Sequence, residues 1–68
     1  MINVENIGNW AGQVWNALND ANKPLSTKDL RKVAKLKVNE MHCGIGWLAK
    51  EGKLNFDEGK DDVMLSLR

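Results

Sequence analysis

Two helical patterns followed by two strand patterns occupy residues 25–67, and this order is the feature that most restricts the fold of the chain. Ser26 is expected to cap the first of these helices, because a serine oxygen accepts a hydrogen bond from a helix-start N–H. Asn39 is expected to open the next helix and Gly52 to end it, since glycine adopts a left-handed cap at low cost. Two alternating stretches follow and predict a β-hairpin with strands at Lys53–Phe56 and Asp62–Leu67.

A longer amphipathic helix is predicted upstream of this region, over Val4–Ala21. Its apolar residues recur with a helical period, and Asn3 is placed to cap the helix start. Pro24 ends the helix, because the residue before a proline is pushed out of helical geometry. The predicted buried face carries Ile7, Ala11, Val14 and Leu18, and its edges carry Val4, Trp10 and Trp15.

Gly8 and Gly12 lie four residues apart on one flank of this first helix. Each glycine costs roughly 1 kcal/mol relative to alanine inside a helix. Two interpretations remain open at this point. The pair is either a tolerated weakness near the helix end or the place where another element approaches the backbone closely.

The second helix and the turn after it contain a smaller set of apolar residues. Asp29 stands at the capping-box position, although aspartate is shorter than the usual glutamate. Leu25–Ser26 is expected to add a short third strand, and the turn contains none of the glycine that is common in such turns. The residues expected to be buried are Leu30, Val33 and Ala34, Leu36 and Val38 in the turn, and Met41, Gly44, Ile45 and Leu48 in the third helix, which is predicted to span Asn39–Glu51.

These elements predict an α+β fold, a winged helix-turn-helix in which three helices precede a C-terminal β-hairpin wing. A chain of 68 residues forms one domain, here residues 1–68. Its single cysteine excludes an internal disulfide and a cysteine-pair zinc site. No apolar run approaches the roughly 20 residues of a membrane helix, and the N-terminus lacks the pattern of a secretory signal. We therefore expect a cytoplasmic protein with a reduced thiol.

Two tryptophan-containing motifs also carry a family resemblance. They are Gly46-Trp47-Leu48-Ala49-Lys50-Glu51-Gly52-Lys53-Leu54 and, upstream, Ala11-Gly12-Gln13-Val14-Trp15 with Leu18. With these motifs, the chain resembles a family of small bacterial winged helix-turn-helix domains of uncharacterised function over nearly its whole length. The resemblance implies a winged helix fold, and it implies no ligand, catalytic residue or partner.

Basic residues gather in the second helix and its turn. Six bases and one acid between Lys23 and Lys37 give this segment a charge of +5. In a helix-turn-helix complex the first motif helix crosses the phosphate backbone and the second enters the major groove. We therefore expect double-stranded DNA as a partner, the alternative being a solvated helix face without a ligand. The predicted DNA-binding residues are Lys28, Arg31, Lys32, Lys35, Lys37, Asn39, His42 and Lys50.

The remainder of the DNA footprint is weaker. Lys50 is the one side chain on the outer arc of the third helix that suits bidentate reading of guanine. The wing tip, residues 57–62, holds four acids and one base, so phosphate should repel it. DNA binding is therefore expected to be weak, mainly electrostatic and low in sequence preference.

Trp47 favours a different function, a protein-interaction or dimerisation module that does not bind DNA. In the predicted helical phase it lies on the outer arc beside Cys43, where an aromatic side chain can anchor a protein contact. A phase error of a third of a turn would instead pack it beneath the wing. Because so small a chain without disulfide or metal buries a modest core, we expect a homodimer. The predicted interface residues are Gly8, Gly12, Trp15, Cys43 and Trp47.

The sequence predicts no catalytic, metal or cofactor site and no small-molecule substrate, so the protein is not expected to be an enzyme. His42 and Cys43 are adjacent, and on a helix neighbouring side chains diverge by about 100 degrees, which prevents a nucleophile–base pair. No other histidine or cysteine is present to complete a metal site. The wing-tip acids lack the spacing of a calcium loop.

Overall fold

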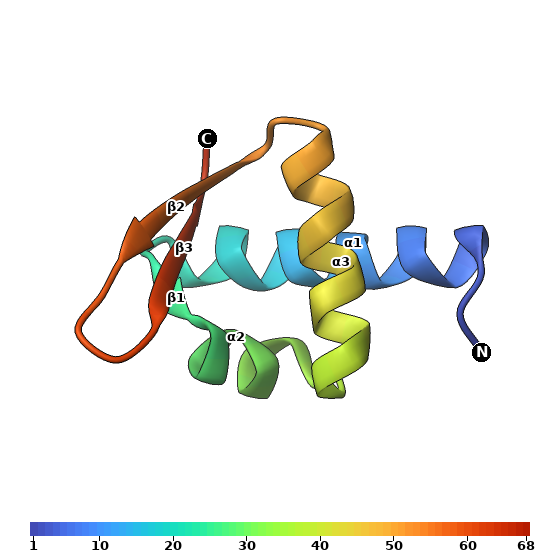
Figure 1. Ribbon diagram of the computed structural model, residues 1–68, viewed down its shortest axis with the longest axis horizontal. Helices are drawn as coiled ribbons and strands as arrows, with labels where there is room; N and C mark the ends of the chain where they lie inside the picture. Colours follow the sequence, from blue (N-terminus) through green and yellow to red (C-terminus); the bar gives the residue numbers. More distant parts are fainter.

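The computed structural model describes residues 1–68 as three helices and one small sheet (Figure 1). The predicted α+β winged helix fold is confirmed, because the helix-turn-helix precedes a C-terminal hairpin. The elements are α1 (Val4–Ala21), β1 (Leu25–Ser26), α2 (Thr27–Ala34), α3 (Val38–Lys50), β2 (Leu54–Glu58) and β3 (Val63–Leu67).

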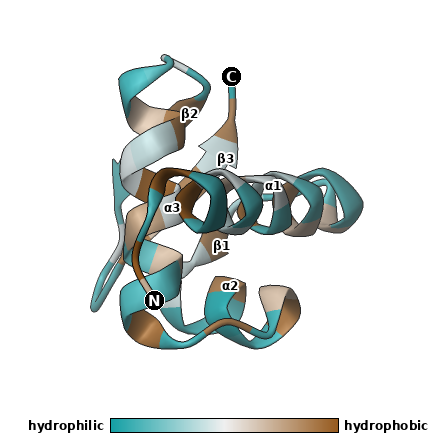
Figure 2. Cartoon of the chain, turned by 90° about the vertical axis from the view of Figure 1, so that its right-hand side faces the viewer, coloured by the Kyte–Doolittle hydropathy of each residue, from teal (hydrophilic) through white to brown (hydrophobic).

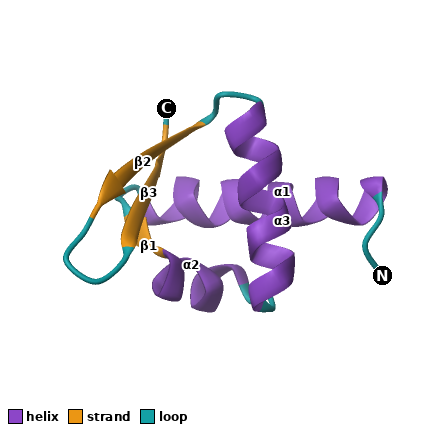
Figure 3. Ribbon diagram, in the orientation of Figure 1, coloured by secondary structure: helices purple, strands orange, loops and turns teal.

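The sheet is antiparallel with the strand order β1-β3-β2, so β3 is central and β2 lies at an edge (Figure 3). Leu65 at the centre of β3 pairs with Leu25 of β1 on one side and with Phe56 of β2 on the other. The short strand predicted at Leu25–Ser26 is therefore present, and it connects the end of α1 to the hairpin. Each hairpin strand differs from its predicted range by one or two residues at its ends.

α1 has the predicted bounds because both of its ends carry strong local signals. The Asn3 side chain accepts a hydrogen bond from the Asn6 backbone N–H at 2.7 Å and thereby caps the start. Asn22 adopts a left-handed conformation with φ of 54°, and its N–H donates to the Leu18 carbonyl at 3.1 Å. Asparagine tolerates this conformation better than most residues, so it closes the helix just before Pro24.

The start of α3 differs from the prediction. The helix begins at Val38, and Asn39 lies inside the first turn, so the assignment of Asn39 as its cap was wrong. The capping position belongs to Lys37, whose backbone N–H donates to Glu40 Oε1 at 3.0 Å. A glutamate at the third helical position supplies this bond whatever the cap residue is.

Gly52 ends α3 as predicted, with φ of +70°. Its N–H donates to the Ala49 carbonyl and the Lys53 N–H donates to the Leu48 carbonyl, both at 3.0 Å. This pair of bonds is the Schellman arrangement that satisfies the last carbonyls of a helix. The turn between α2 and α3 contains no glycine. Lys35 adopts the left-handed conformation there, with φ of 58°, and ends α2.

The core lies where α1, α2 and α3 meet the inner face of the sheet, as the apolar segments in Figure 2 indicate. Val33 and Val38 were predicted to be buried, but they are 50% and 46% exposed. Leu30 and Ala34 alone define the buried line of the short helix α2, and Val33 lies to one side of it. Val38 occupies the first turn of α3, before the buried face begins. The buried apolar residues are Ala11, Val14, Ala17, Leu18, Leu25, Leu30, Ala34, Leu36, Met41, Leu48, Leu54 and Leu65.

α3 crosses α1 (Figure 1), and their backbones come very close at Gly44. A Cβ atom placed on Gly44 would lie 2.9 Å from the backbone carbon and oxygen of Trp10 and 3.0 Å from the Ala11 nitrogen. Only glycine allows the two backbones to approach in this way. The close crossing places the flank of α1 that carries Gly8 directly beside α3.

Candidate functional site

The predicted phosphate-binding side chains lie on one exposed surface formed by α2 and the turn after it. We call this surface the basic face; its members are Lys28, Arg31, Lys32, Lys35 and Lys37, and all five are exposed. The one ion pair in the structure joins Lys53 Nζ to Glu51 Oε1 at 3.8 Å, far along the chain from this surface. The five cations of the basic face therefore have no carboxylate partner.

A polar arc on α3 follows the basic face along the chain. Asn39, His42 and Lys50 are exposed on it, and the spacing of three and then eight residues keeps them on one side of the helix. Gly46 lies between His42 and Lys50, and a Cβ added there would meet nothing within 4 Å. The arc therefore presents three polar side chains with a shallow gap in the middle.

The predicted helical phase placed Trp47 on the outer arc of α3 beside Cys43, and in the structure its side chain lies beside α1. Its indole turns toward α1, where Cη2 and Cζ2 lie 3.8 Å and 3.9 Å from the position that a Cβ on Gly8 would take. The side chain is 37% exposed, so it is partly buried against another surface of its own chain. The indole therefore lies beside Gly8, at a distance where a Cβ would make ordinary van der Waals contact.

Four of the five predicted interface residues come together in one groove between α1 and α3, which we call the tryptophan groove. Gly8, Gly12, Trp15 and Trp47 all line it, whereas Cys43 is half-buried and lies outside its lining. The groove has a volume of about 280 Å³. Its remaining lining residues are Ala11, Asn16, Leu48, Glu51 and Lys53.

One acid of the predicted wing tip has a structural role that the sequence did not reveal. Asp62 accepts hydrogen bonds from Thr27 Oγ1, at 2.9 Å to Oδ1 and 2.7 Å to Oδ2. The backbone N–H groups of Val63 and Lys28 also donate to this carboxylate, at 2.7 Å and 3.4 Å. The Thr27 hydroxyl, supported by these N–H groups, holds the pKa of Asp62 below its ordinary value of 3.8. Asp57, Glu58 and Asp61 stay exposed on the wing.

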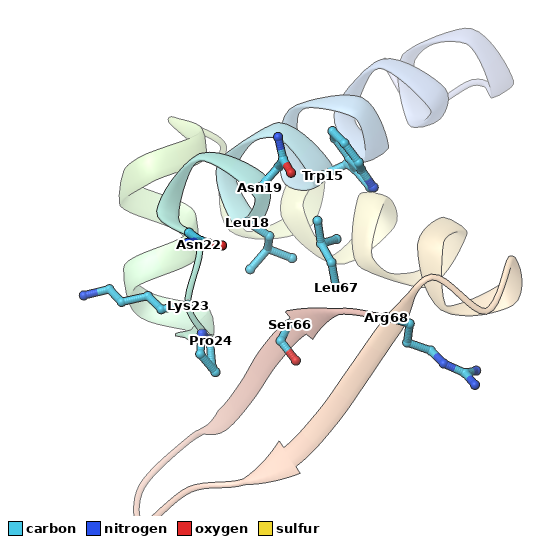
Figure 4. A pocket seen from close by; sticks show the side chains of 9 residues that line it. All are labelled: Trp15, Leu18, Asn19, Asn22, Lys23, Pro24, Ser66, Leu67 and Arg68. Carbon is cyan, nitrogen blue, oxygen red and sulfur yellow. The ribbon is translucent and has the colours of Figure 1, made fainter.

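A second depression of about 460 Å³ lies between the C-terminal half of α1 and the end of β3 (Figure 4). Its walls carry an indole, amides, a hydroxyl, aliphatic groups and two cations, and they include no histidine, cysteine or carboxylate side chain. No group of three or more histidine, cysteine or acidic residues is arranged to hold a metal ion anywhere in the chain. The lining residues are Trp15, Leu18, Asn19, Asn22, Lys23, Pro24, Ser66, Leu67 and Arg68.

The longest helix, α1 with 18 residues, lacks the apolar length needed to cross a membrane, and the shorter helices lack it as well.

Comparisons with known proteins agree with this architecture. A family model described as "Winged helix-turn-helix domain (DUF2582)" matches residues 1–67. The solution NMR structure of protein BT2368 from Bacteroides thetaiotaomicron is similar, with a TM-score of 0.81 and 30% sequence identity over 93% of this chain and 76% of that chain. No curated protein matches the sequence.

Proposed function

Because the chain belongs to the family of winged helix-turn-helix domains described as DUF2582, we propose that it binds double-stranded DNA weakly, mainly through phosphates. The observation that carries the proposal is the basic face, whose five exposed cations have no carboxylate partner. Unpaired lysine and arginine side chains release condensed counterions from DNA when they contact phosphate, and this release supplies most non-specific affinity. The proposed role is a binding role without catalysis.

The polar arc of α3 would face the major groove in this proposal, since it follows the basic face in the helix-turn-helix. Asn39 has the amide that can pair with adenine, and Lys50 can donate to guanine. Gly46 lies between these two residues on the arc and has no side chain that could reach a base. Few base contacts are therefore available, and a low sequence preference is expected.

The wing is not part of the proposed DNA interface. Asp57, Glu58 and Asp61 are exposed on it and none forms an ion pair, so phosphates would be repelled at close range. The proposal includes a cytoplasmic location, where a lone thiol such as Cys43 stays reduced.

Salt titration of DNA binding tests the proposal. A labelled duplex should bind the protein at low salt, and the affinity should fall steeply as the salt concentration approaches physiological values. Exchanging Arg31 and Lys32 for glutamate should abolish binding. The matched control exchanges Lys53 and Arg68, which lie at the end of the sheet remote from α2 (Figure 1). DNA affinity that survives the Arg31–Lys32 exchange, or that falls equally in both double variants, would contradict the proposal.

The tryptophan groove supports a second candidate function, homodimerisation without DNA binding. Trp15 and Trp47 line it and are 38% and 37% exposed, and aromatic side chains of this kind anchor protein interfaces. Two copies could use the same patch reciprocally, since a two-fold interface is complementary to itself.

Sedimentation equilibrium over a wide concentration range tests this second candidate. The most informative variant is Gly12→Glu, because Gly12 is exposed and a Cβ there would meet nothing within 4 Å. The fold should tolerate this side chain, while a dimer that uses the tryptophan groove should dissociate. Trp47→Ala removes the aromatic anchor as a companion variant. A wild-type protein that stays monomeric at high micromolar concentration would eliminate the dimer.

A further inference from the structure

We propose that the open edge of β2 binds a basic, extended peptide by adding it to the sheet as a fourth strand. β2 (Leu54–Glu58) pairs with β3 along one side only, and the other side has no neighbouring strand. The proposal goes beyond DNA binding because it assigns a partner to the wing, which the basic face does not use.

The register of the hairpin identifies the backbone groups that are free at this edge. The Lys53 carbonyl accepts from the Arg68 N–H at 3.0 Å, and the Gly59 N–H donates to the Asp62 carbonyl at 2.8 Å. In an antiparallel pair, every second residue exchanges hydrogen bonds with its partner strand. The odd-numbered residues of this strand therefore face β3. The backbone N–H and C=O groups of Leu54, Phe56 and Glu58 point away from β3 and are available to an added strand.

This edge lacks three of the features that natural proteins use to block strand addition, and the charges that it carries are acidic. Proline, bulges and lysine side chains usually protect such edges. β2 contains no proline or lysine, and its five residues pair with β3 in unbroken register. Four of the five residues are exposed, and Phe56 at the centre is 50% exposed. An incoming strand would therefore gain an apolar contact as well as backbone hydrogen bonds.

Charge complementarity determines which strand fits. Asp57 and Glu58 are exposed on β2, Asp61 follows in the wing turn, and none of them forms an ion pair. Lysine or arginine side chains opposite these acids would gain cross-strand pairing.

A second copy of β2 is a less favourable occupant than a basic peptide. Antiparallel pairing centred on Phe56 would put Asp57 opposite Asn55 and Glu58 opposite Leu54. Neither acid would then have a cation directly opposite it.

A synthetic peptide of alternating lysine and valine, labelled with a fluorophore, is the probe. Fluorescence anisotropy should show saturable binding, and the same peptide with glutamate in place of lysine should not bind. Amide hydrogen exchange locates the site, because the N–H groups of Leu54, Phe56 and Glu58 should become protected in the complex. Protection confined to other segments would overturn the proposal.

Two charge-reversal variants provide the matched comparison. Asp57→Lys combined with Glu58→Lys should weaken peptide binding by at least about tenfold, because the cross-strand pair at Asp57 becomes repulsive and the edge no longer attracts a cationic strand. Glu5→Lys combined with Asp20→Lys makes the same change in net charge on α1 and should leave the affinity unchanged. Phe56→Ala should weaken binding severalfold while keeping every backbone group.

Equal losses in the two double variants would show unspecific charge attraction and overturn the proposal. Edge protection that rises with protein concentration in the absence of peptide would assign the edge to a second copy and overturn it as well. The β2–β3 amides report whether each variant is folded, so a loss of binding can be separated from a loss of structure.

Discussion

The Thr27 hydroxyl donates to the carboxylate of Asp62 at 2.7 Å from Oδ2, and this bond joins the first residue of α2 to the last residue of the wing turn, 35 positions away in the sequence. The same carboxylate lies 3.4 Å from the Lys28 backbone nitrogen, so it contributes a negative charge at the start of α2. The contact therefore fixes the wing relative to the helix that carries the basic face. One of the four wing-tip acids serves the fold and is not free for a ligand.

The first prediction concerns the pH dependence of this contact. Because the folded-state pKa of Asp62 lies below its ordinary value of 3.8, the ionised carboxylate stabilises the protein above that pH. The stabilisation should be lost as the pH falls from 3.8 through the lower pKa of the folded state. Asp62→Asn should therefore lower Tm near neutral pH, and the difference from the wild type should shrink in acid.

Thermal unfolding followed by circular dichroism at several pH values measures this difference. Asp61→Asn is the matched control, since Asp61 is the exposed neighbour and forms no hydrogen bond through its side chain. A Tm difference for Asp62→Asn that is constant across the acid range would refute the assigned role.

The second prediction compares two glycines of α3. Gly44→Ala places a methyl group 2.9 Å from the Trp10 backbone, so α1 and α3 must separate. The expected loss is about 1–3 kcal/mol of unfolding free energy. Gly46→Ala adds the same methyl group into open space and should stabilise the protein by about 0.5–1 kcal/mol, because alanine favours helix. Urea denaturation of both variants gives the comparison, and losses of similar size would contradict the close crossing.

The fold could be predicted because its boundaries depend on local chemistry. Asn3 and Ser26 cap their helices through side-chain oxygens, at 2.7 Å and 3.1 Å from the N–H three residues on. Pro24 and Gly52 end elements through backbone restrictions that a single residue imposes. Such signals need no knowledge of distant contacts, so the order and type of the elements follow from the sequence.

The site was less predictable because it depends on contacts between distant segments. The indole of Trp47 turns toward α1 and lies beside Gly8, which is far away in the sequence. Helical periodicity assigns Trp47 a direction but cannot reveal this neighbour. In the same way, no residue near Asp62 in the sequence indicates that the Thr27 hydroxyl will donate a hydrogen bond to its carboxylate. Asn39 was misassigned because the start of α3 is fixed by a hydrogen bond from the Lys37 N–H to the Glu40 side chain. The helix therefore begins at Val38, one residue before Asn39.

The third prediction concerns two apolar residues of α2, Leu30 and Val33, which were both predicted from the sequence to be buried. Leu30 is fully buried, so Leu30→Ala should lower the free energy of unfolding by about 2–5 kcal/mol through lost contacts and a residual cavity. Val33 is 50% exposed, and Val33→Ala should change it by no more than about 0.5 kcal/mol. Urea denaturation measures both values. A cost for Val33→Ala close to that for Leu30→Ala would mean that a partner covers this face of α2.

The last prediction separates phosphate contacts from base contacts in the proposed DNA complex. Lys35 is exposed on the basic face without an ion pair, so Lys35→Gln should remove one phosphate contact. The slope of log affinity against log salt should then become shallower by about 0.9, and all duplex sequences should lose affinity equally. Asn39→Ala removes no charge from the exposed arc of α3, so the salt slope should stay unchanged while any preference for adenine disappears. Titrations of adenine-rich and guanine-rich duplexes at several salt concentrations measure both effects. A salt slope that is unchanged in Lys35→Gln would exclude this lysine from the phosphate contacts and move the proposed interface away from the end of α2.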